Sequence, residues 1–288
     1  MYHILYAFLW LITWLPLRIL YIISDISFPI IYYIVRYRRA VVKSNLAMSF
    51  PDKSENERRN IERRFYHHFC DLFVETMYEM HLNEKEIRRR VTYGNLDAIL
   101  EQYAKGKSVM MMTAHYGNWE WPSALALYIP KEFPLYGIYK ELRNKKFNAL
   151  IFSLRSKFGG IPVEKHEILR FMINLKKNGK SGNFWMISDQ TPNGRNIHFW
   201  TNFLNQDTPV LTGTEQLARK FDFPVFYVEI TQSKRGYYHC EFIPVSLDSA
   251  KTTEFEITEK YMHLLQKTIE AKPEFWLWSH RRWKHVRK

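Results

Sequence analysis

One histidine of this sequence stands where a general base would be useful. His115 follows an apolar run, residues 108–113, and Glu120 comes five residues later. A neutral imidazole can take a proton from an attacking hydroxyl, and a neighbouring carboxylate can fix the tautomer of the ring and stabilise the imidazolium that forms. We therefore consider His115 a candidate base with Glu120 as its partner. The alternative is a histidine that is hydrogen-bonded and purely structural.

The position of this pair carries more information than its spacing. A second histidine, His81, also has a carboxylate five residues on, Glu86, but it lies at the end of a charged helical stretch. His115 instead stands between an expected strand and an expected helix, the edge at which open α/β sheets bind ligands. Residues five apart on an ideal helix point about 140° away from each other, because each residue turns the chain by about 100°. His115 and Glu120 can therefore meet only if His115 lies on the turn before the helix, and Gly117 makes such a turn easier.

Other catalytic devices are missing from the sequence. No Ser or Cys has the pattern of a nucleophile elbow, so a covalent acyl-enzyme is not indicated. The sequence has neither a Gly-rich phosphate loop nor a cluster of Cys, His and Asp with metal spacing. We therefore predict a direct transfer through a base, with no enzyme nucleophile, no metal and no cofactor. The two cysteines, Cys70 and Cys240, form no disulfide framework and fit a reducing compartment.

The alternation of apolar runs and helical patterns after residue 106 predicts an α/β domain. Strands separated by helices of about ten or more residues imply crossover connections and a sheet covered by helices on both faces. We therefore predict a mixed sheet flanked by helices. The expected strands are 108–113, 134–139, one near 161, 183–188, 225–231 and 237–244, and the expected helices are 119–128, 144–157, 167–177, 212–221 and 255–270.

The N-terminal segment has a different composition. Residues 5–17 and 19–35 are almost entirely apolar, and Pro16 and Pro29 are each expected to kink or end a helix there. A helix of about 20 residues crosses the hydrocarbon core of a membrane, so the stretch is long enough for one span and an interfacial piece. A charged residue at mid-bilayer is costly, which argues against one uninterrupted span centred on Arg18. We expect membrane attachment; the alternative is an apolar helix that docks on the domain or on partner chains.

These differences predict two parts of the chain. Residues 1–43 are expected to form a membrane-associated segment, and residues 44–288 a catalytic domain. Within that domain, 44–106 is predicted to be helical and 107–288 to be α/β. Ser54 with Glu57 three residues later is a capping box, the signature of a helix that begins at residue 55.

Composition narrows the classes of partner. The chain has 288 residues, 46% of them hydrophobic and 25% charged, which excludes a mostly disordered protein. Its 42 basic and 29 acidic residues give a net charge of +13, which favours anionic partners such as phosphates, acidic proteins or anionic lipid. Aromatic residues make up 16%, a bias that suits apolar ligands and membrane interfaces.

Several segments, in order along the chain, resemble those of one enzyme family. The segment from His115 to Glu120 resembles the His-x4-Glu/Asp motif of the glycerolipid acyltransferase superfamily. The wider pattern resembles one branch, the late acyltransferases of lipid A biosynthesis of the lauroyl/myristoyl type, over most of the chain. The matching blocks are Asn45-Leu46 with Ser49-Phe50-Pro51, Leu154-Arg155 with Gly159, Asp189-Gln190, Thr212-Gly213 with Leu217-Ala218-Arg219, and Trp278-Ser279-His280-Arg281-Arg282-Trp283-Lys284.

The resemblance implies a glycerolipid acyltransferase-like fold and a reaction. A fatty acyl chain would move from acyl carrier protein, or less often from coenzyme A, to a hydroxyl of a lipid A precursor, a phosphorylated glycolipid. The family has an N-terminal membrane helix and works at the cytoplasmic face of the inner membrane. The implied partners are therefore acyl carrier protein or acyl-CoA, the glycolipid acceptor and the bilayer, and no nucleic acid.

The resemblance also implies roles for individual residues. His115 would deprotonate the acceptor hydroxyl with support from Glu120, and Arg155 and Asp189 occupy the family's other two polar site positions. Lys140 stands where the family has the arginine of a Tyr-Arg-Pro block, so the positive charge is kept and the planar guanidinium is lost. Without the resemblance, Arg155 would be interpreted as an exposed charge on a basic helix, and Asp189 as the start of a turn.

Two other functions remain open from the sequence. The acceptor of an acyltransferase could be another lipid, such as a lysophospholipid, an aminolipid or a glycolipid. A basic, aromatic-rich protein could also bind nucleic acid or a membrane without catalysis. Nucleic-acid binding leaves the apolar N-terminal segment unexplained and gives His115 no role.

Overall fold

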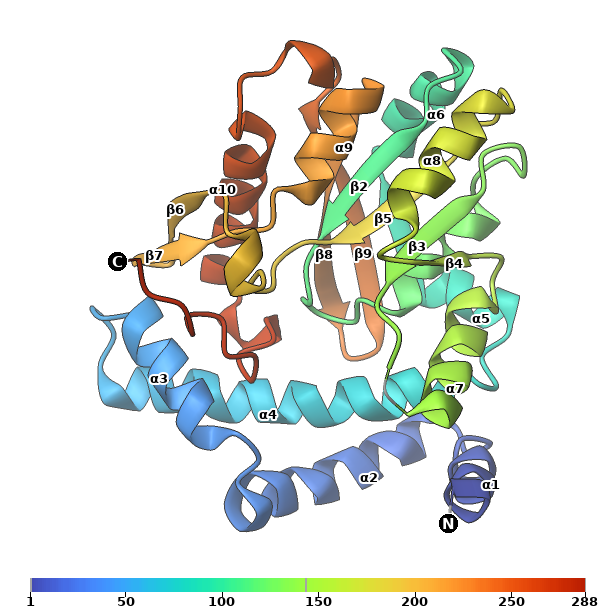
Figure 1. The fold of residues 1–288 in the computed structure, drawn as a ribbon. Helices are drawn as coiled ribbons and strands as arrows, with labels where there is room; N and C mark the ends of the chain where they lie inside the picture. Colours follow the sequence, from blue (N-terminus) through green and yellow to red (C-terminus); the bar gives the residue numbers. More distant parts are fainter. Residues whose placement is uncertain (1, 143, 288) are drawn as a thin grey trace.

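A seven-stranded mixed sheet forms the centre of the computed structural model, which describes residues 2–142 and 144–287. The strand order is β1-β9-β8-β2-β5-β3-β4 (Figure 1). β8 and β9 pair antiparallel, and all other neighbours in this sheet pair parallel. The strands are β1 (Val91–Gly94), β2 (Val109–Thr113), β3 (Leu135–Tyr139), β4 (Ile161–Glu164), β5 (Asn183–Ile187), β8 (Val225–Lys234) and β9 (Tyr237–Ser246), with a separate hairpin of β6 (Trp200–Phe203) and β7 (Gln206–Pro209).

Helices flank the sheet, and α4 runs beneath it with α2 packed below α4 (Figure 1). The α-helices are α1 (Tyr2–Ile12), α2 (Leu17–Pro29), α3 (Arg39–Ser49), α4 (Glu55–Tyr78), α5 (Glu84–Arg90), α6 (Leu96–Ala104), α7 (Lys145–Ser156), α8 (Ile168–Lys177), α9 (Gly213–Phe221) and α10 (Glu256–Ala271). The π-helical segment is η1 (Ile30–Val35), and the 3-10 helices are η2 (Trp121–Leu127), η3 (Gly194–Asn196), η4 (Ser249–Lys251) and η5 (Pro273–Phe275).

The predicted mixed sheet flanked by helices is confirmed. The expected strands and helices of the α/β part are present with small shifts at their ends, although the helix expected over 119–128 is the 3-10 helix η2. β2 lies between β8 and β5, and all five of its residues are buried. Helices cover both faces of such a strand, so its sequence is a continuous apolar run and not an alternating one.

The helical prediction for 44–106 needs a correction. Its first long helix begins as expected, because Ser54 and Glu57 form both hydrogen bonds of a capping box. However, β1 lies inside this range and forms one edge of the sheet, where it pairs with β9. A strand of four residues directly after a basic helix is too short to show its own periodicity in the sequence. The hairpin β6–β7 is likewise an addition to the predicted elements.

The apolar N-terminal stretch forms a long helix. α2 continues directly into η1, and among the described residues one helix, Leu17–Val35, is long and apolar enough to cross a membrane by length and composition. The prolines act as predicted: Pro16 precedes α2, and Pro29 stands where the α-helical hydrogen bonding ends. One face of this helix is buried against α4 and the opposite face is exposed.

Candidate active site

The carboxyl ends of two neighbouring parallel strands bring together a histidine and a carboxylate. β2 and β5 pair in register, with Thr113 opposite Ile187. His115 and Asp189 each follow two residues later, so they lie side by side at the same edge of the sheet. Nδ1 of His115 lies 2.7 Å from Oδ1 of Asp189, and the backbone N–H of His115 donates to Oδ2 at 3.1 Å.

Asp189 is buried and well supplied with hydrogen bonds. Its side chain is 2% exposed, and Nε1 of Trp276 donates to Oδ2 at 2.9 Å. Burial alone would raise the pKa of this carboxyl, but the charge of His115 and the hydrogen bonds from His115 and Trp276 outweigh burial and lower the pKa. Asp189 is therefore a carboxylate that accepts the Nδ1 proton of His115.

This contact fixes the tautomer of His115 and leaves its other nitrogen available. With the proton on Nδ1, Nε2 carries a lone pair, as a general base requires. The side chain is 21% exposed, Nε2 accepts a long hydrogen bond of 3.4 Å from the side-chain amide of Gln190, and the His115 and Trp119 rings pack edge to face with centroids 5.1 Å apart. The ring is thus held on one side by Asp189 and reachable on the other.

The turn that carries His115 is held by its own polar groups and by the C-terminal segment. Gly117 has a φ of +58°, the left-handed conformation that glycine adopts most easily, which confirms the expected turn. Oδ1 of the buried Asn118 accepts the N–H groups of Glu120 and Trp121, both at 3.1 Å. The C-terminal segment adds two backbone hydrogen bonds, from Gly117 to the Phe275 carbonyl at 3.0 Å and from Leu277 to the His115 carbonyl at 3.1 Å.

Glu120 pairs with an arginine and not with His115, which corrects the expectation that it fixes the imidazole. Nε and Nη2 of Arg155, on α7, donate to the two carboxylate oxygens of Glu120 at 2.8 and 2.7 Å. The turn at Gly117 sends the chain away from the sheet edge before Glu120, so Asp189 from β5 reaches Nδ1 instead. Burial would lower the pKa of Arg155, but the hydrogen bonds and charge of Glu120 raise it.

A third carboxyl lies next to this ion pair. Glu79, at the end of α4, is 1% exposed, and neither of its side-chain oxygens has a hydrogen-bond partner among the described residues. Burial, and secondarily the charge of Glu120, raise its pKa well above the usual range. Burial thus favours the protonated form of Glu79 beside the charged pair of Glu120 and Arg155.

Lys140 lies at the same edge of the sheet as the two pairs. It directly follows β3, the strand next to β5, and its side chain is exposed. Among the contacts of the described residues, no hydrogen bond or ion pair joins it to His115 or to Glu120. The structure thus brings His115 to Asp189 and Glu120 to Arg155, and leaves Lys140 free to meet a ligand.

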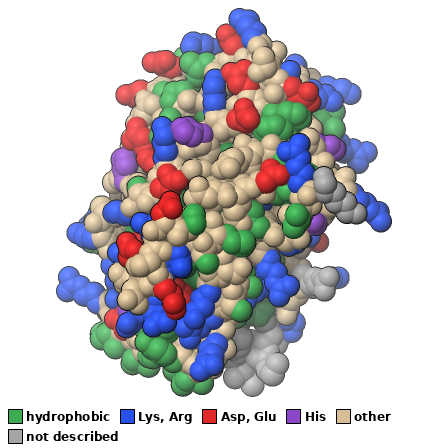
Figure 2. Space-filling view, turned by 90° about the vertical axis from the view of Figure 1, so that its left-hand side faces the viewer, with side chains coloured by type: hydrophobic (Ala, Val, Ile, Leu, Met, Phe, Trp, Pro, Cys, Tyr) green, Lys and Arg blue, Asp and Glu red, His purple; other side chains and the backbone are tan. Residues whose placement is uncertain are grey.

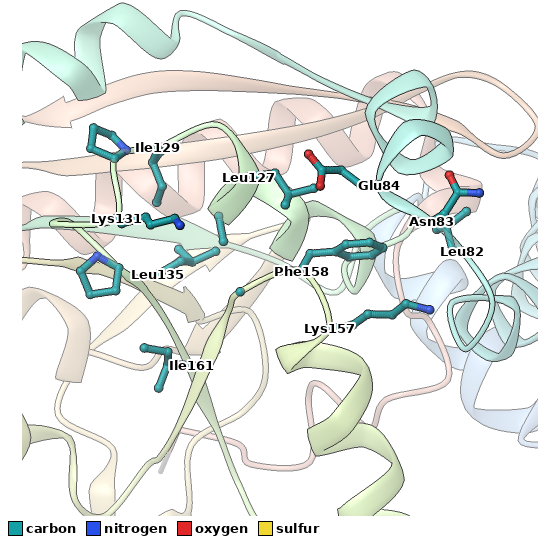
Figure 3. A pocket seen from close by; sticks show the side chains of 14 residues that line it. Leu82, Asn83, Glu84, Leu127, Ile129, Lys131, Leu135, Lys157, Phe158 and Ile161 are labelled. Carbon is teal, nitrogen blue, oxygen red and sulfur yellow. The ribbon is translucent and has the colours of Figure 1, made fainter.

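Two cavities share apolar wall residues, and one of them borders the Glu120–Arg155 pair. The first is lined by Trp119, Glu120 and Arg155 together with apolar residues of β3, β4 and β5. The second, of about 660 Å³, shares Leu135 and Ile161 with the first and continues toward α5, where Leu127 and Phe158 line it (Figure 3). The two cavities thus have apolar wall residues in common; the one beside the polar site is small, about 40 Å³, and the larger one is within the volume range of ligand sites.

Some residues of the site were not identified from the sequence. Trp276, which is 87 residues from Asp189 in the sequence, donates a hydrogen bond to it. Gln190, the residue after Asp189, contacts Nε2 of His115. The run from Trp278 to Lys284 is buried in part: Arg282 is fully buried, and burial lowers its pKa to about 10. The signal for Gln190 was its place directly after an expected strand. The signal for Trp276 was the group of tryptophans among the basic residues near position 280, which indicates packing or lipid contact but does not point to Asp189. No cluster of three or more His, Cys, Asp or Glu placed to hold a metal ion occurs in the described part of the chain.

The whole chain is similar in sequence to known proteins. A family model for bacterial lipid A biosynthesis acyltransferases matches residues 1–285. The chain is 24% identical over 291 residues to the lipid A biosynthesis lauroyltransferase of Escherichia coli (strain K12), covering 96% of this chain and 92% of that protein. It is 20% identical over 286 residues to the lipid A biosynthesis palmitoleoyltransferase of the same organism and to the lipid A biosynthesis acyltransferase of Shigella flexneri, covering 96% of this chain and 91% of each relative.

Proposed function

Because the chain belongs to the bacterial lipid A biosynthesis acyltransferase family, it is an acyltransferase, and we propose that it moves a fatty acyl chain from a thioester to a hydroxyl of a lipid A precursor with His115 as the general base. The observation that carries this proposal is the contact of Nδ1 of His115 with Asp189, which leaves Nε2 as the proton acceptor on the reachable side of the ring. That arrangement suits an attacking hydroxyl and needs no covalent intermediate.

In the proposed reaction, Nε2 takes the proton of the acceptor hydroxyl while its oxygen attacks the thioester carbonyl. The carbonyl oxygen carries the negative charge of the tetrahedral intermediate, and the C–S bond then breaks to release the donor thiolate. The imidazolium returns its proton to this sulfur, so His115 ends the cycle neutral. Asp189 keeps Nδ1 protonated and stabilises the imidazolium between the two proton transfers.

Arg155 is proposed to bind an anionic group of a substrate, such as a phosphate of the acceptor. Its guanidinium is oriented by Glu120 and still 29% exposed, so part of its donor fork remains available. Glu120 is then a positioning residue for Arg155. Lys140, exposed at the same edge of the sheet, is proposed as a second contact for negative charge.

The two cavities are proposed to hold the acyl chain, which would enter by the small one beside Glu120 and Arg155 and continue past Leu135 and Ile161 into the larger one. Trp119, which lines the small cavity, also packs against His115. An acyl chain in this space would bring its thioester carbonyl to the site. Acyl carrier protein is the proposed donor, because an acidic protein would be attracted to a chain with a net charge of +13; coenzyme A is the donor to compare it with.

The proposed location is the inner membrane, with the catalytic domain on its cytoplasmic face. The acceptor is a lipid, so the enzyme must reach a bilayer. Basic residues directly follow the apolar N-terminal segment, at Arg36, Arg38, Arg39 and Lys43, and the negative surface potential of the cytoplasmic leaflet would attract them.

The test is acyl transfer by the purified full chain, with labelled acyl-acyl carrier protein or acyl-CoA and a tetra-acylated lipid A precursor. His115→Ala is expected to lower kcat by about 10²–10⁴-fold, the usual contribution of a general base, while leaving the thermal unfolding temperature near that of the parent. Mass spectrometry of the product identifies the acylated hydroxyl.

A matched control is His239→Ala, which removes another histidine paired with a carboxylate, Glu241, on the exposed side of β9. It should retain full turnover. Near-normal transfer by His115→Ala would refute the assignment of the base. Transfer only to a lysophospholipid, an aminolipid or another glycolipid would keep the base and replace the acceptor.

A further inference from the structure

The inner face of α2 is buried on the catalytic domain. At about 100° per residue, Leu17, Leu20, Ser24 and Phe28 fall on one side of this helix, and all four are buried against the domain. The helix therefore packs lengthwise along α4, as Figure 1 shows.

Polar contacts also hold α2 in this place. Ser24 donates to the buried carboxylate of Asp71 at 2.6 Å, and the Tyr21 hydroxyl donates to the buried Glu75 at 2.7 Å. Arg235, in the turn between β8 and β9, binds both Asp71 and Asp25 of α2. Moving α2 away would leave buried carboxylates without these partners, which is costly.

The chain before and after α2 also contacts the domain. Before α2, the carbonyl of Trp10 lies 3.0 Å from Nε2 of His81, and the Trp14 ring packs on the same histidine with centroids 4.3 Å apart. After α2, Nδ2 of Asn45 donates to the carbonyls of Trp278 and His280 at 2.8 and 2.9 Å. Both ends of α2 are therefore on the same side of any membrane as the catalytic domain.

A membrane-spanning position of α2 is incompatible with these contacts. α4 lies alongside α2 and has exposed charged residues in its first half, among them Arg59, Arg63 and Arg64. A spanning α2 would draw α4 and these charges into the hydrocarbon core, where charged side chains are costly.

The outer face of α2 and η1 remains apolar and uncovered. Five large side chains along it are between 42% and 76% exposed. In Figure 2, hydrophobic side chains gather along the lower edge of the molecule, and Lys and Arg side chains lie directly above them. We define the outer apolar face as Ile19, Ile22, Ile26, Ile30 and Ile34.

Exposed basic residues border the outer apolar face. Arg18 lies on the flank of α2, and Arg36 and Arg38 follow η1, all of them exposed. An apolar stripe bordered by basic residues matches the composition of a leaflet with anionic headgroups, since the apolar side chains reach the acyl chains while the cations meet the headgroups.

We infer that α2 and η1 form an interfacial helix that lies in the plane of the membrane, with the outer apolar face in one leaflet of an anionic bilayer and the catalytic domain docked on the same side. The chain thus binds one leaflet and does not cross the membrane. This inference concerns the manner of attachment and does not depend on the identity of the general base.

The test measures the depth of three positions along the helix. Nitroxide labels are placed at Ile19→Cys, Ile26→Cys and Ile34→Cys in the full chain, bound to vesicles of phosphatidylethanolamine and phosphatidylglycerol. The parent chain, whose Cys70 and Cys240 are buried, serves as the labelling control. The three labels should lie at similar depth, about 5–10 Å into the interface, as for other interfacial helices.

A spanning helix gives a different profile. Ile26 would then lie near the centre of the hydrocarbon core, which is about 30 Å thick, with Ile19 and Ile34 near opposite interfaces. That depth profile would overturn the inference. Neither profile involves turnover, so the result leaves the proposed acyl transfer to its own experiment.

A second measurement tests the partner. Ile22→Glu with Ile26→Glu should weaken vesicle binding by about tenfold or more, because both side chains lose their burial in the leaflet. Leu247→Glu, at a similarly exposed apolar residue outside the face, is the matched control. Unchanged vesicle binding, or dissociation of a dimer of the lipid-free chain by the double variant without loss of vesicle binding, would assign the face to a second copy and refute the inference.

Discussion

A buried carboxyl lies beside each end of the segment from His115 to Glu120, and the two carboxyls differ in their pKa. Beside the first end, at His115, Asp189 accepts hydrogen bonds from His115 and Trp276, and its pKa is lowered although it is buried. Beside the second end, at Glu120, Glu79 is equally buried, its oxygens have no hydrogen-bond partner among the described residues, and its pKa is raised.

The difference shows the effect of local partners at similar burial: His115 and Trp276 lower the pKa of Asp189, whereas burial without hydrogen-bond donors raises the pKa of Glu79. At the first end the carboxylate stays ionised and can stabilise an imidazolium. At the second end Arg155 is paired with the carboxylate of Glu120, and its guanidinium stays partly exposed and able to attract a further anion. One end is thus suited to proton transfer and the other to anion binding.

Asp189→Asn, beside the first end, is expected to have the largest effect on turnover. The amide cannot stabilise an imidazolium and allows the other tautomer of His115, so we expect kcat to fall by about 10²–10⁴-fold. Steady-state kinetics check this, with near-UV circular dichroism to confirm the fold. Asp222→Asn, which removes a carboxylate paired with Lys107 at the surface, should change kcat less than about twofold. A fall of less than about tenfold for Asp189→Asn would contradict the assignment.

Arg155→Lys, at the second end, is expected to weaken binding of the acceptor more than it lowers turnover. The lysine keeps the charge and loses the bidentate fork, so we expect KM for the acceptor to rise by about 10-fold with a smaller change in kcat. Glu120→Gln should have a similar effect, and the double variant should show less than the sum of the two in free energy, because both act through one contact. A loss of kcat by Glu120→Gln as large as that of Asp189→Asn would instead connect Glu120 to His115.

The smallest expected effect is on how the free energy of unfolding changes with pH, to which Asp189 and Glu79 contribute in opposite directions. A lowered folded-state pKa means that the contribution of Asp189 is present above the unfolded value of about 3.9 and is lost as the pH falls below it. A raised pKa means that the contribution of Glu79 is present below about 4.3 and is lost as the pH rises toward neutrality and beyond.

Thermal unfolding of the detergent-solubilised chain separates the two contributions. Asp189→Asn should flatten the acid side of the stability profile, and Glu79→Gln the neutral and alkaline side, each by about a few degrees. Asp97→Asn, at an exposed residue of α6, should leave both sides as they are. The same change on the same side from both variants would show that the two carboxyls do not differ as described.

The strand ends were predictable from the sequence, whereas the contacts between them were not. Apolar runs placed the ends of β2 and β5 within one residue, which puts His115 and Asp189 just beyond two strands. Strand order decides which ends are neighbours, and β2 lies beside β5, although β3 is the next strand along the chain. Without that order, the nearest carboxylate in sequence, Glu120, was the natural partner to expect for the histidine.

Contacts between distant segments were beyond the reach of local patterns for the same reason. Arg155 meets Glu120 because α7 packs beside the turn, and Trp276 meets Asp189 because the C-terminal segment returns to the sheet edge. Amphipathic spacing predicts that a helix has a buried face but does not say what covers it. The prolines and the capping box act within a few residues, so their effects were predicted correctly.

The buried Glu75 has a consequence for how this protein can be handled. It accepts the hydroxyl of Tyr21, on α2, and the amide of Asn118, in the turn after His115, and burial raises its pKa to about 7. α2 is therefore part of the support of the turn that carries His115, two hydrogen bonds away from it. Deleting them to obtain a water-soluble fragment would remove one donor from this carboxyl, so such a fragment would report on an altered enzyme even with a donor that needs no membrane.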